Sequence, residues 1–479
     1  MKIKTSAIVY GIRYIRRFGL RTLIIRIIEK KREKDSEYQS FYLETKASLE
    51  QLEKQRMEVS HWNKKEKISI VTPLYHTPAI FLRELIESVL ESSYENWQLC
   101  FADATQDGEE NQIENIVKEY QKMDEKLTGK KSRICYKKLS QNYGIAENTN
   151  QALAMAEGDY IAFLDHDDII TPDALYEMAL AAKCAKKTGK EANMFYEDKV
   201  NENRTAFFEP HFKPDFNQDL LNSNNYITHF LMVSRELLDQ VGGINKEYDG
   251  AQDYDFILRC TELADNVIHI PKVLYHWRVH ERSTAAGAGS KDYAIDAGKC
   301  AIESHLQRMG ENGKVVVTPY FGFYRIEYGI NTENKTEDYV LFADQSLKPL
   351  NADWKQILYA DCSRKKIGVV GGKIYDRHHR IYEAAFFEKG DWTGAACGEN
   401  VFSGLREGYG GYMHRANIQM DCDRVSEKCM LVKKEVLEQI EDYEQQIRTP
   451  EFSYIVCQKA KEMGYRIMYE PEVKMIFKS

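Results

Sequence analysis

Three aspartates gather within residues 164–168, which read Leu-Asp-His-Asp-Asp and follow an apolar run over residues 160–163. That run is typical of a buried strand. Asp165 and Asp167 are two residues apart, so an extended backbone places both carboxylates on one face. Carboxylate oxygens are the ligands that Mg²⁺ and Mn²⁺ prefer, and these ions commonly accompany a diphosphate. The segment therefore predicts a divalent-cation site; the alternative is a solvated loop leading into a helix near Thr171.

The elements that must position this cluster are strands and helices that alternate from about residue 67 to residue 310, which predicts an α/β domain with a mainly parallel sheet. The first strand is expected over residues 68–73. A second, over residues 97–102, ends at Asp103. Ligands bind at the carboxyl ends of the strands in such sheets. Asp103 and the Asp165 cluster are therefore expected to share one crevice.

The N-terminal segment, residues 1–66, differs in composition from the rest. Residues 1–34 hold eleven Lys or Arg and two Glu. Apolar residues recur there at helical spacing with arginines between them, and Gly19 is expected to split the stretch into two helices; the apolar positions are Ile8, Ile12, Ile15, Leu20, Leu23, Ile24 and Ile27. Such a basic amphipathic helix suits an anionic membrane surface, or else packs on its own protein with a solvated basic face. Residues 35–66 are interpreted as a helical connector.

Residues 311–479 look like a partial copy of the region before them. Residues 339–344 repeat the pattern of residues 160–165, residues 431–437 that of residues 232–238, and Pro471 that of Pro271. The counterpart of Asp167 is a serine, Ser346, and most of the first part of the domain is missing. The sequence therefore predicts a truncated, degenerate α/β domain with a structural or acceptor-positioning role.

Composition excludes several classes of protein. The 479 residues have a net charge of −8, with 43% hydrophobic and 29% charged residues, which argues against nucleic acid as a partner. The chain has no apolar run of 18 residues, and arginines interrupt its N-terminal apolar stretch, so neither a membrane-spanning helix nor a secretory signal is predicted. Ten scattered cysteines without a Cys-x-x-Cys motif predict reduced, intracellular thiols.

The motifs of residues 67 to about 285, taken in this order, resemble the family 2 glycosyltransferases of the GT-A (Rossmann-like) fold, and most of all bacterial enzymes that build rhamnose-rich and other cell-surface polysaccharides. Five stretches carry the resemblance: residues 71–75 (Val-Thr-Pro-Leu-Tyr), Asp103, residues 165–167 (Asp-His-Asp), residues 250–259 and residues 275–280 (Tyr-His-Trp-Arg-Val-His). The basic N-terminal segment (1–66), a catalytic domain (67–310) and a degenerate copy (311–479) also look like that subgroup.

The resemblance implies a role for each acidic position. Asp167 would hold the metal directly, and Asp165 would contact the ribose or the ion. Asp253, after Gln252 at the start of an expected helix, would be the catalytic base; the alternative is an N-cap, and Asp255 is the nearer rival. Asp198 would lie near the donor sugar.

The resemblance also implies a nucleotide pocket. Asp103 would accept a hydrogen bond from the pyrimidine ring N–H, and Pro73 and Tyr75 would form its wall, with Tyr75 stacking on the base. Asn142 belongs to an Asn-x-Gly segment that borders the nucleotide in the family, although it suits a turn equally well. Many relatives place an arginine next to Asn150, where this chain has a threonine.

Three alternating side chains, His276, Arg278 and His280, share a face if they lie on one strand. A neutral imidazole could complete the metal site, and Arg278 could pair with the diphosphate. The sequence does not decide which histidine binds the ion. His280 is favoured because residues 281–287 follow it as an expected lid of small residues.

The sequence thus predicts an inverting glycosyltransferase that needs Mn²⁺ or Mg²⁺ and moves a sugar from a UDP- or dTDP-sugar donor to a growing, lipid-linked surface glycan. It would act in the cytoplasm, peripherally on the inner face of the cell membrane. One alternative is a non-catalytic nucleotide- or glycan-binding subunit on the same fold, which would have little need for the set Asp103, Asp165, Asp167 and Asp253. Another is a nucleotidyltransferase, but residues 71–77 lack the glycine-rich basic loop of such enzymes.

Overall fold

The computed structural model describes residues 14–16, 18–32, 42–106, 112–189, 192–203, 206–280, 291–330, 336–388, 400–447, 449 and 451–478. The chain folds into two compact units. Unit 2 comprises residues 33–216 and 227–301, and unit 1 comprises residues 1–32, 217–226 and 302–479. The division falls within helix α12 (Lys291–Arg308).

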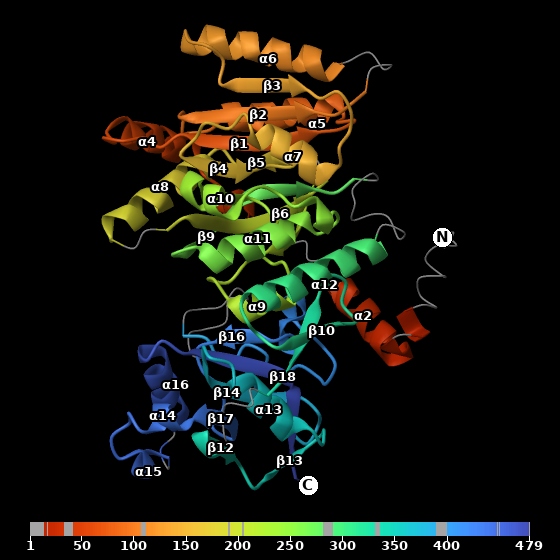
Figure 1. The fold of residues 1–479 in the computed structure, drawn as a ribbon, viewed down its shortest axis with the longest axis vertical. Coiled ribbons are helices and arrows are strands. Elements are labelled where there is room, and N and C mark those ends of the chain that lie inside the picture. Colours follow the sequence, from red (N-terminus) through yellow and green to blue (C-terminus); the bar gives the residue numbers. More distant parts are fainter. Residues whose placement is uncertain are drawn as a thin grey trace. The chain divides into compact units, whose positions relative to one another are not determined.

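Unit 2 has the strand and helix alternation that the sequence predicts (Figure 1). Its elements are α4 (Leu49–Ser60), β1 (Ile68–Leu74), α5 (Ala79–Leu90), β2 (Trp97–Asp103), α6 (Gln112–Thr128), β3 (Ile134–Lys138), α7 (Ile145–Leu153), β4 (Tyr160–Phe163), β5 (Ile169–Ile170), α8 (Ala174–Lys187), β6 (Met194–Glu202), β7 (Phe207–His211), β8 (Leu231–Ser234), α10 (Arg235–Val241), η1 (Lys246–Tyr248), α11 (Gln252–Leu263) and β9 (Val267–Arg278).

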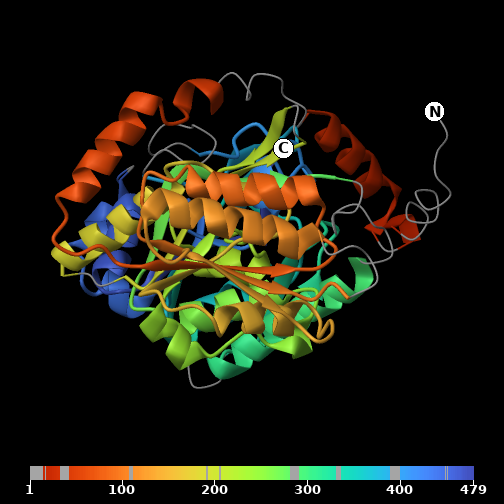
Figure 2. The ribbon, with the colours of Figure 1, turned by 90° about the horizontal axis from the view of Figure 1, so that it is seen from above.

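The sheet of unit 2 runs in the order β3-β2-β1-β4-β8-β6-β9-β5, with β7 paired to β6. Strands β1, β2, β3 and β4 are parallel, whereas β8 is antiparallel to both β4 and β6. Strand β2 is buried at every position, as expected for a parallel strand that is covered on both faces. Figure 2 shows helices on both faces of the sheet. The order reverses next to β1, and such a switch point opens a ligand crevice at the strand ends.

Unit 1 is built around a second mixed sheet. Its elements are α2 (Leu20–Arg32), α9 (Gln218–Ser223), β10 (Gly313–Val317), β11 (Tyr324–Tyr328), η3 (Thr336–Asp338), β12 (Tyr339–Ala343), β13 (Leu347–Pro349), α13 (Trp354–Cys362), β14 (Ile367–Tyr375), β15 (Ile381–Glu383), η4 (Tyr412–Asn417), β16 (Met420–Cys422), β17 (Cys429–Lys433), α14 (Lys434–Leu437), α15 (Tyr443–Gln446), α16 (Phe452–Glu462) and β18 (Arg466–Phe477).

The two sheets share a topology, which the predicted internal copy would explain. The order β12-β17-β14-β18-β13 of unit 1 repeats the order β4-β8-β6-β9-β5 of unit 2. The directions match as well, because β14 and β18 are parallel like β6 and β9, and β17 is antiparallel to both its neighbours like β8. The half of the sheet formed by β1, β2 and β3 has no counterpart among the described strands of unit 1. Unit 1 is therefore a truncated version of the same α/β fold.

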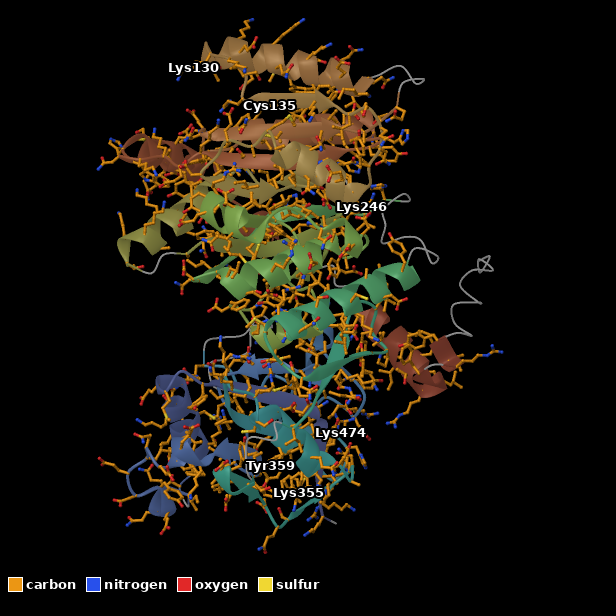
Figure 3. All side chains as sticks on the ribbon, in the orientation of Figure 1. Lys130, Cys135, Lys246, Lys355, Tyr359 and Lys474 are labelled. Atoms are coloured by element: carbon orange, nitrogen blue, oxygen red, sulfur yellow. The ribbon has the colours of Figure 1, made fainter. Side chains whose placement is uncertain are left out.

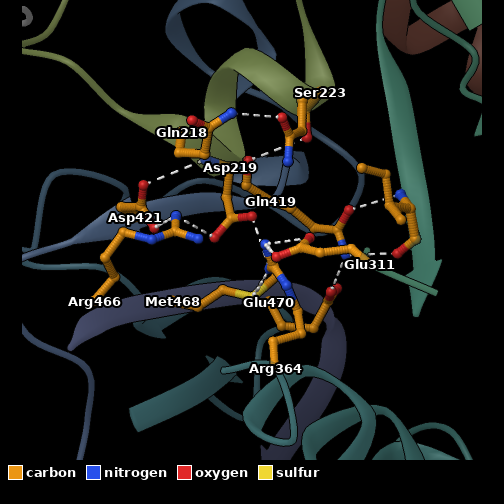
Figure 4. Close-up of polar contacts among 12 residues, drawn as sticks. Gln218, Asp219, Ser223, Glu311, Arg364, Gln419, Asp421, Arg466, Met468 and Glu470 are labelled. Carbon is orange, nitrogen blue, oxygen red and sulfur yellow. Dashed lines mark hydrogen bonds and ion pairs between the residues drawn. The ribbon is translucent and has the colours of Figure 1, made fainter. Parts of the chain in front are cut away.

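Residues 217–226 join unit 1, whereas the sequence analysis placed them inside a continuous domain of residues 67–310. The reason is a buried ionic cluster (Figure 4). Asp219 lies 2.7 Å from Arg364 and 2.9 Å from Arg466. The neighbouring Asn217 donates its side-chain N–H to the backbone oxygen of Asp421. These partners are far away in sequence, so hydrophobic patterning along the chain gave no sign of them.

The expected break at Gly19 is present. Gly19 has φ +85 and separates the helical residues 14–16 and 18 from α2. Leu20, Ile24 and Ile27 recur on one side of α2 and are 57%, 49% and 51% exposed. The expected helical positions Ile8 and Ile12 lie outside the described residues. No helix in the described part of the chain combines the length and the apolar character that a bilayer crossing needs.

The cysteines form no disulfide within the described residues. Cys422 and Cys429, a loose pair in the sequence, are both buried and free. Cys135 of β3, labelled in Figure 3, pairs in register with Cys100 of β2, and both are free thiols. The prediction of reduced thiols holds for every cysteine that the structure describes.

Candidate active site

The site is built where β1, β2 and β4 end together. Pro73 pairs with Ala102, and Leu74 pairs with Asp103. The last pair between β1 and β4 joins Val71 and Phe163. Because parallel strands keep their register, the chain two residues beyond Phe163 emerges level with Pro73. The acidic segment and Asp103 therefore meet at one edge of the sheet, as predicted.

The acidic segment forms a compact carboxylate cluster. Asp165, Asp167 and Asp168 each offer one carboxylate oxygen, and these oxygens lie within 4.8 Å of one another. His280 extends the cluster, because its Nε2 lies 2.8 Å from Oδ2 of Asp167. Oxygen and imidazole nitrogen atoms gathered in this way are a donor set that suits Mn²⁺ or Mg²⁺.

Asp168 is the buried member of the cluster. Tyr275 donates its hydroxyl hydrogen to Oδ2, and the backbone N–H of Arg278 donates to Oδ1 at 2.7 Å. Burial, together with the charges of Asp167 and Asp165, raises the pKa of Asp168 well above its ordinary value. Asp168 thus ties the loop to β9 and leaves the outer carboxylates to face the crevice.

Asp165 is half-exposed and contacts a residue that the sequence analysis did not single out. Its Oδ2 lies 3.3 Å from Nε2 of His229. Burial within the acidic recess, and then the charge of Asp167, raises the pKa of Asp165 to about 6. Two carboxylates that repel each other in this way gain from any cation placed between them.

Asp253 stands in the first turn of α11, as the sequence predicts. It acts electrostatically on two groups of the site, His229 and Lys199. Its rival Asp255 is fully buried and pairs with Arg259 at 2.8 Å, which identifies Asp255 as a structural residue. Asp253 is therefore the aspartate of this helix that acts on groups of the site.

Lys199 is a second residue that the sequence analysis missed. It lies on β6, is mostly buried, and places Nζ 3.9 Å from the centre of the Trp277 ring. Burial, followed by the repulsion of Lys213, lowers its pKa to about 7, although Asp168 and Asp253 act in the opposite direction. The available signal in the sequence was a lysine that closes the charged run Glu197-Asp198-Lys199, directly after the apolar residues 194–196.

Asp103 is fully buried and already has protein partners. Its Oδ1 accepts the backbone N–H of Thr105 at 2.9 Å. Its Oδ2 accepts the hydroxyl of Tyr136 at 2.7 Å and Nζ of Lys138 at 3.1 Å. Tyr75, just beyond β1, is exposed beside this strand end.

Asn142 takes the turn conformation that the sequence left open. Its side-chain oxygen accepts the backbone N–H of Gly144 at 3.0 Å and the amide of Asn148 at 2.8 Å. Gly144 has φ +95, and a Cβ there would lie 3.1 Å from Asp249. The Asn-x-Gly segment therefore forms a tight loop before α7, which glycine makes possible.

Three predicted site residues do not join the acidic cluster in this structure. His276 is buried. Its Nε2 is hydrogen-bonded to the hydroxyl group of Tyr42, and the centres of its ring and the Phe207 ring are 5.0 Å apart. Arg278 pairs through its guanidinium with Glu84 at 2.8 Å and Glu202 at 3.0 Å.

Asp198 is the third of these residues. It accepts the backbone N–H of Lys213 at 2.7 Å and lies 2.9 Å from Nε2 of His269. Asp198 is therefore engaged with the backbone of Lys213 and the ring of His269. The expected lid over residues 281–287 lies outside the described residues.

Residues 69–242 match the family model described as "Glycosyl transferase family 2". This segment is a family 2 glycosyltransferase domain. The family 2 match runs from β1 to the end of α10 and contains Asp103, Asp165 and Asp167. Asp253 and His280 follow it in the chain.

Two curated relatives of this chain are longer than the chain itself. It is 28% identical over 490 residues to the uncharacterized protein y4gI of Sinorhizobium fredii, covering 84% of this chain and 52% of that protein. It is 33% identical over 291 residues to the O-antigen biosynthesis protein RfbC of Myxococcus xanthus, covering 60% of this chain and 22% of RfbC. The chain thus spans about half the length of the first and about a fifth of the second.

A solved structure with a likeness to this chain is S. aureus TarS 1–349 in complex with UDP-GlcNAc. It shares 18% sequence identity at a TM-score of 0.39, over 50% of this chain and 66% of that chain.

Proposed function

We propose that this chain is an inverting, metal-dependent glycosyltransferase that transfers a sugar from a UDP- or dTDP-sugar to a growing cell-surface polysaccharide carried on a lipid. The observation that carries the proposal is the carboxylate cluster of Asp165, Asp167 and Asp168, which is flanked by His229 and Lys199, two groups on which Asp253 acts electrostatically. Two relatives are named for surface polysaccharides, RfbC for O-antigen and a putative Bacillus subtilis glycosyltransferase, 32% identical over 131 residues, for teichuronic acid. These names support the class of product.

The acidic cluster fits a divalent cation. Asp167 and His280 would hold it directly, and Asp165 would contact it or the ribose. The fit rests on carboxylate oxygens within 4.8 Å of one another and is supported by the raised pKa of Asp165, which comes first from burial and then from the charge of Asp167. A bound Mn²⁺ or Mg²⁺ would neutralise the charge that gathers on a departing nucleoside diphosphate. We assign His280 and not His276 to the cation, because His276 is buried against Tyr42.

Asp253 would accept the proton of the attacking acceptor hydroxyl at one of its carboxylate oxygens. In-line displacement at the anomeric carbon requires the base on the face opposite the leaving group. Asp253 comes from α11, whereas the cation carboxylates come from the loop after β4, so the two groups approach the crevice from different elements.

The nucleotide base would lie beside the end of β2. Asp103 has four acceptor positions on its carboxylate, of which Thr105, Tyr136 and Lys138 use three. The remaining position, on Oδ1, would accept the ring N–H of uracil or thymine. Tyr75 would stack on the base, and Pro73 would form the wall below it.

The N-terminal helix would bring the enzyme to its acceptor. The exposed apolar side of α2, with Arg21 beside it at 76% side-chain exposure, matches the interface of an anionic membrane. The enzyme would then act peripherally on the cytoplasmic face of the cell membrane, where lipid-linked glycans are extended. Arg278, paired with two glutamates, would support the loop of Asp168 rather than bind the diphosphate.

Substitution of the base tests the proposed reaction. Asp253→Asn removes proton acceptance but keeps the size of the side chain, so the rate of donor consumption should fall at least about a hundredfold. The assay follows release of UDP or dTDP from sugar donors in the presence of Mn²⁺ and membrane lipid extract. Nucleotide binding should stay within about twofold of the wild-type value, because Asp253 is not part of the nucleotide pocket.

Asp239→Asn, on α10, serves as the matched control and should keep wild-type turnover. Equal turnover by Asp253→Asn and wild type would contradict the assignment of the base. Tight nucleotide binding with no turnover of any donor would favour the alternative of a non-catalytic binding subunit.

A further inference from the structure

His229 contacts Asp165 of the acidic cluster and is influenced by the charge of Asp253, although the sequence predicts no role for it. Its Nε2 lies 3.3 Å from Asp165. Burial lowers the pKa of the imidazole to about 4, and the charge of Asp253 is the strongest effect that raises it. The ring keeps 22% of its side-chain surface accessible, so it borders the crevice instead of filling the core. His229 is therefore an imidazole in direct contact with a carboxylate of the acidic cluster.

The orientation of the ring is fixed by an aromatic neighbour. The imidazole stacks on Tyr275, with ring centres 5.6 Å apart and an angle of 26° between the planes. Tyr275 is itself fixed, because its hydroxyl binds Asp168. The edge of the imidazole thus keeps one direction relative to the acidic cluster.

The backbone of His229 is held by a buried ion pair. Nζ of Lys213 donates to the carbonyl oxygens of Ile227 at 2.6 Å and of His229 at 2.9 Å. The backbone N–H of Phe230 donates to Glu197 at 2.8 Å, and Glu197 lies 3.7 Å from Lys213. Charges as deeply buried as these are costly unless they are paired and hydrogen-bonded. Residues 227–230 are therefore held by backbone hydrogen bonds to both members of this ion pair.

The fold itself does not require this ion pair. Strand β14 of unit 1 repeats β6, with Gly371 paired to Tyr469 as Tyr196 is paired to His269. Gly372 follows Gly371 in the copy, and Glu197 follows Tyr196 in unit 2. The copy therefore has a glycine where unit 2 has the buried carboxylate. Since unit 1 forms the same sheet without it, Glu197 serves the site and not the sheet.

We infer that His229 binds the donor sugar and helps to determine which sugars the enzyme accepts. This inference rests on the proposed function, in which the sugar lies between the diphosphate at the carboxylate cluster and the base Asp253. The ring nitrogens of an imidazole can form hydrogen bonds with sugar hydroxyls. Lys213 and Glu197 are its positioning residues. Asp198, which the resemblance places near the sugar, is instead engaged with His269 and the Lys213 backbone.

The test compares binding of nucleotides with binding of their sugars. His229→Ala and His229→Gln are titrated with UDP and dTDP, and with UDP-glucose, UDP-N-acetylglucosamine and dTDP-glucose, all with Mn²⁺. For the sugar nucleotide that wild type binds best, His229→Ala should weaken binding about tenfold, while UDP and dTDP change by less than about twofold. His229→Gln, which keeps a hydrogen-bonding group, should recover part of the loss. His61→Ala, on the exposed end of α4, is the matched control and should equal wild type in both.

Equal weakening of nucleotides and sugar nucleotides by His229→Ala, or no weakening of either, would overturn the inference while leaving the proposed function intact. A His229→Gln variant that binds the sugar nucleotide no better than His229→Ala would also count against a hydrogen bond to the sugar. Wild-type protein that binds none of these compounds would refute the proposed function and, with it, this inference.

Discussion

Neighbouring carboxylates in this chain do different work because they touch different partners. Asp168 is satisfied by Tyr275 and a backbone N–H, whereas Asp167, next to it, meets only His280 among the hydrogen bonds of the described residues. Burial likewise separates Asp255, which is buried and paired with Arg259, from Asp253, which is only half-buried. Burial and partners, which residue type does not reveal, decide which aspartate is available to a ligand.

Unit 1 contains a second group of buried acids, whose titration should be visible in stability. Burial raises the pKa of Glu470 to about 7, and burial together with the charge of Glu470 raises the pKa of Asp361 well above its ordinary value. Between about pH 4.5 and pH 7 the folded state thus keeps protons that the unfolded state releases. Stability from these groups is present at the low end of this window and is lost as the pH rises.

Thermal unfolding at pH 5 and pH 8 measures this effect. Asp361→Asn replaces the titrating carboxyl group by an amide, so it should remove roughly 2 kcal/mol of the wild-type difference between the two pH values. Asp338→Asn, in η3, is the exposed control and should keep the wild-type profile. A variant Asp361→Asn with an unchanged pH profile would show that the pair is not protonated in the folded protein.

At the scale of elements, β9 explains why the sequence left the choice of histidine open. Alternation placed His276, Arg278 and His280 on one face, but the strand ends at Arg278. His276 stays in the sheet and packs on Tyr42, whereas His280 lies beyond the strand and reaches Asp167. Periodicity predicts a shared face only as far as the strand extends, and its end depends on tertiary contacts.

Much of the fold could be predicted because its signals are local. Buried parallel strands read as continuous apolar runs, the strand ends carry Asp103 and Asp165, and the copy repeats a recognisable pattern. His229 and Lys199 were not found, because a histidine in a loop and a lysine in a strand acquire meaning only from residues distant in sequence. The transfer of residues 217–226 to unit 1 escaped prediction for the same reason.

Helix α2 gives an element-scale prediction. Leu20→Gln combined with Ile24→Gln should weaken binding to vesicles containing phosphatidylglycerol about tenfold, because two apolar side chains no longer enter the interface. Sedimentation with vesicles measures the bound fraction. The matched control is Leu49→Gln, which changes an apolar residue of α4 that is 81% exposed. Equal vesicle binding by the double variant and wild type would contradict the membrane role of α2.

At the scale of the whole molecule, the chain carries one complete and one truncated version of the same α/β unit. The truncated version keeps Asp344 at the position of Asp165 but lacks two other carboxylates of the site. Ser346 takes the position of Asp167, and Ser453, which is 200 residues after Asp253 as Pro471 is after Pro271, takes the position of the proposed base. On strand β14, Ile374 stands for Lys199 by register. We therefore expect nucleotide and cation to bind unit 2 alone.

Calorimetric unfolding of the whole chain checks this expectation. Two compact units with separate cores should give two transitions, and nucleotide with Mn²⁺ at about a hundred times the Kd should stabilise one of them by about 2.7 kcal/mol. The other transition should not move. Asp344→Asn, in the copy, is the control and should leave the ligand-induced shift unchanged, whereas an equal shift of both transitions would mean that unit 1 binds ligand too.

The most direct test of the central claim is calorimetric titration of the full chain with UDP and with dTDP, each with and without Mn²⁺. We predict binding that requires the ion and falls at least about tenfold in Asp167→Asn, which keeps the size of the side chain but loses its charge. The better nucleotide would identify the base of the donor. Folded protein that binds neither nucleotide in the presence of Mn²⁺, or an Asp167→Asn variant that binds as wild type does, would contradict the account.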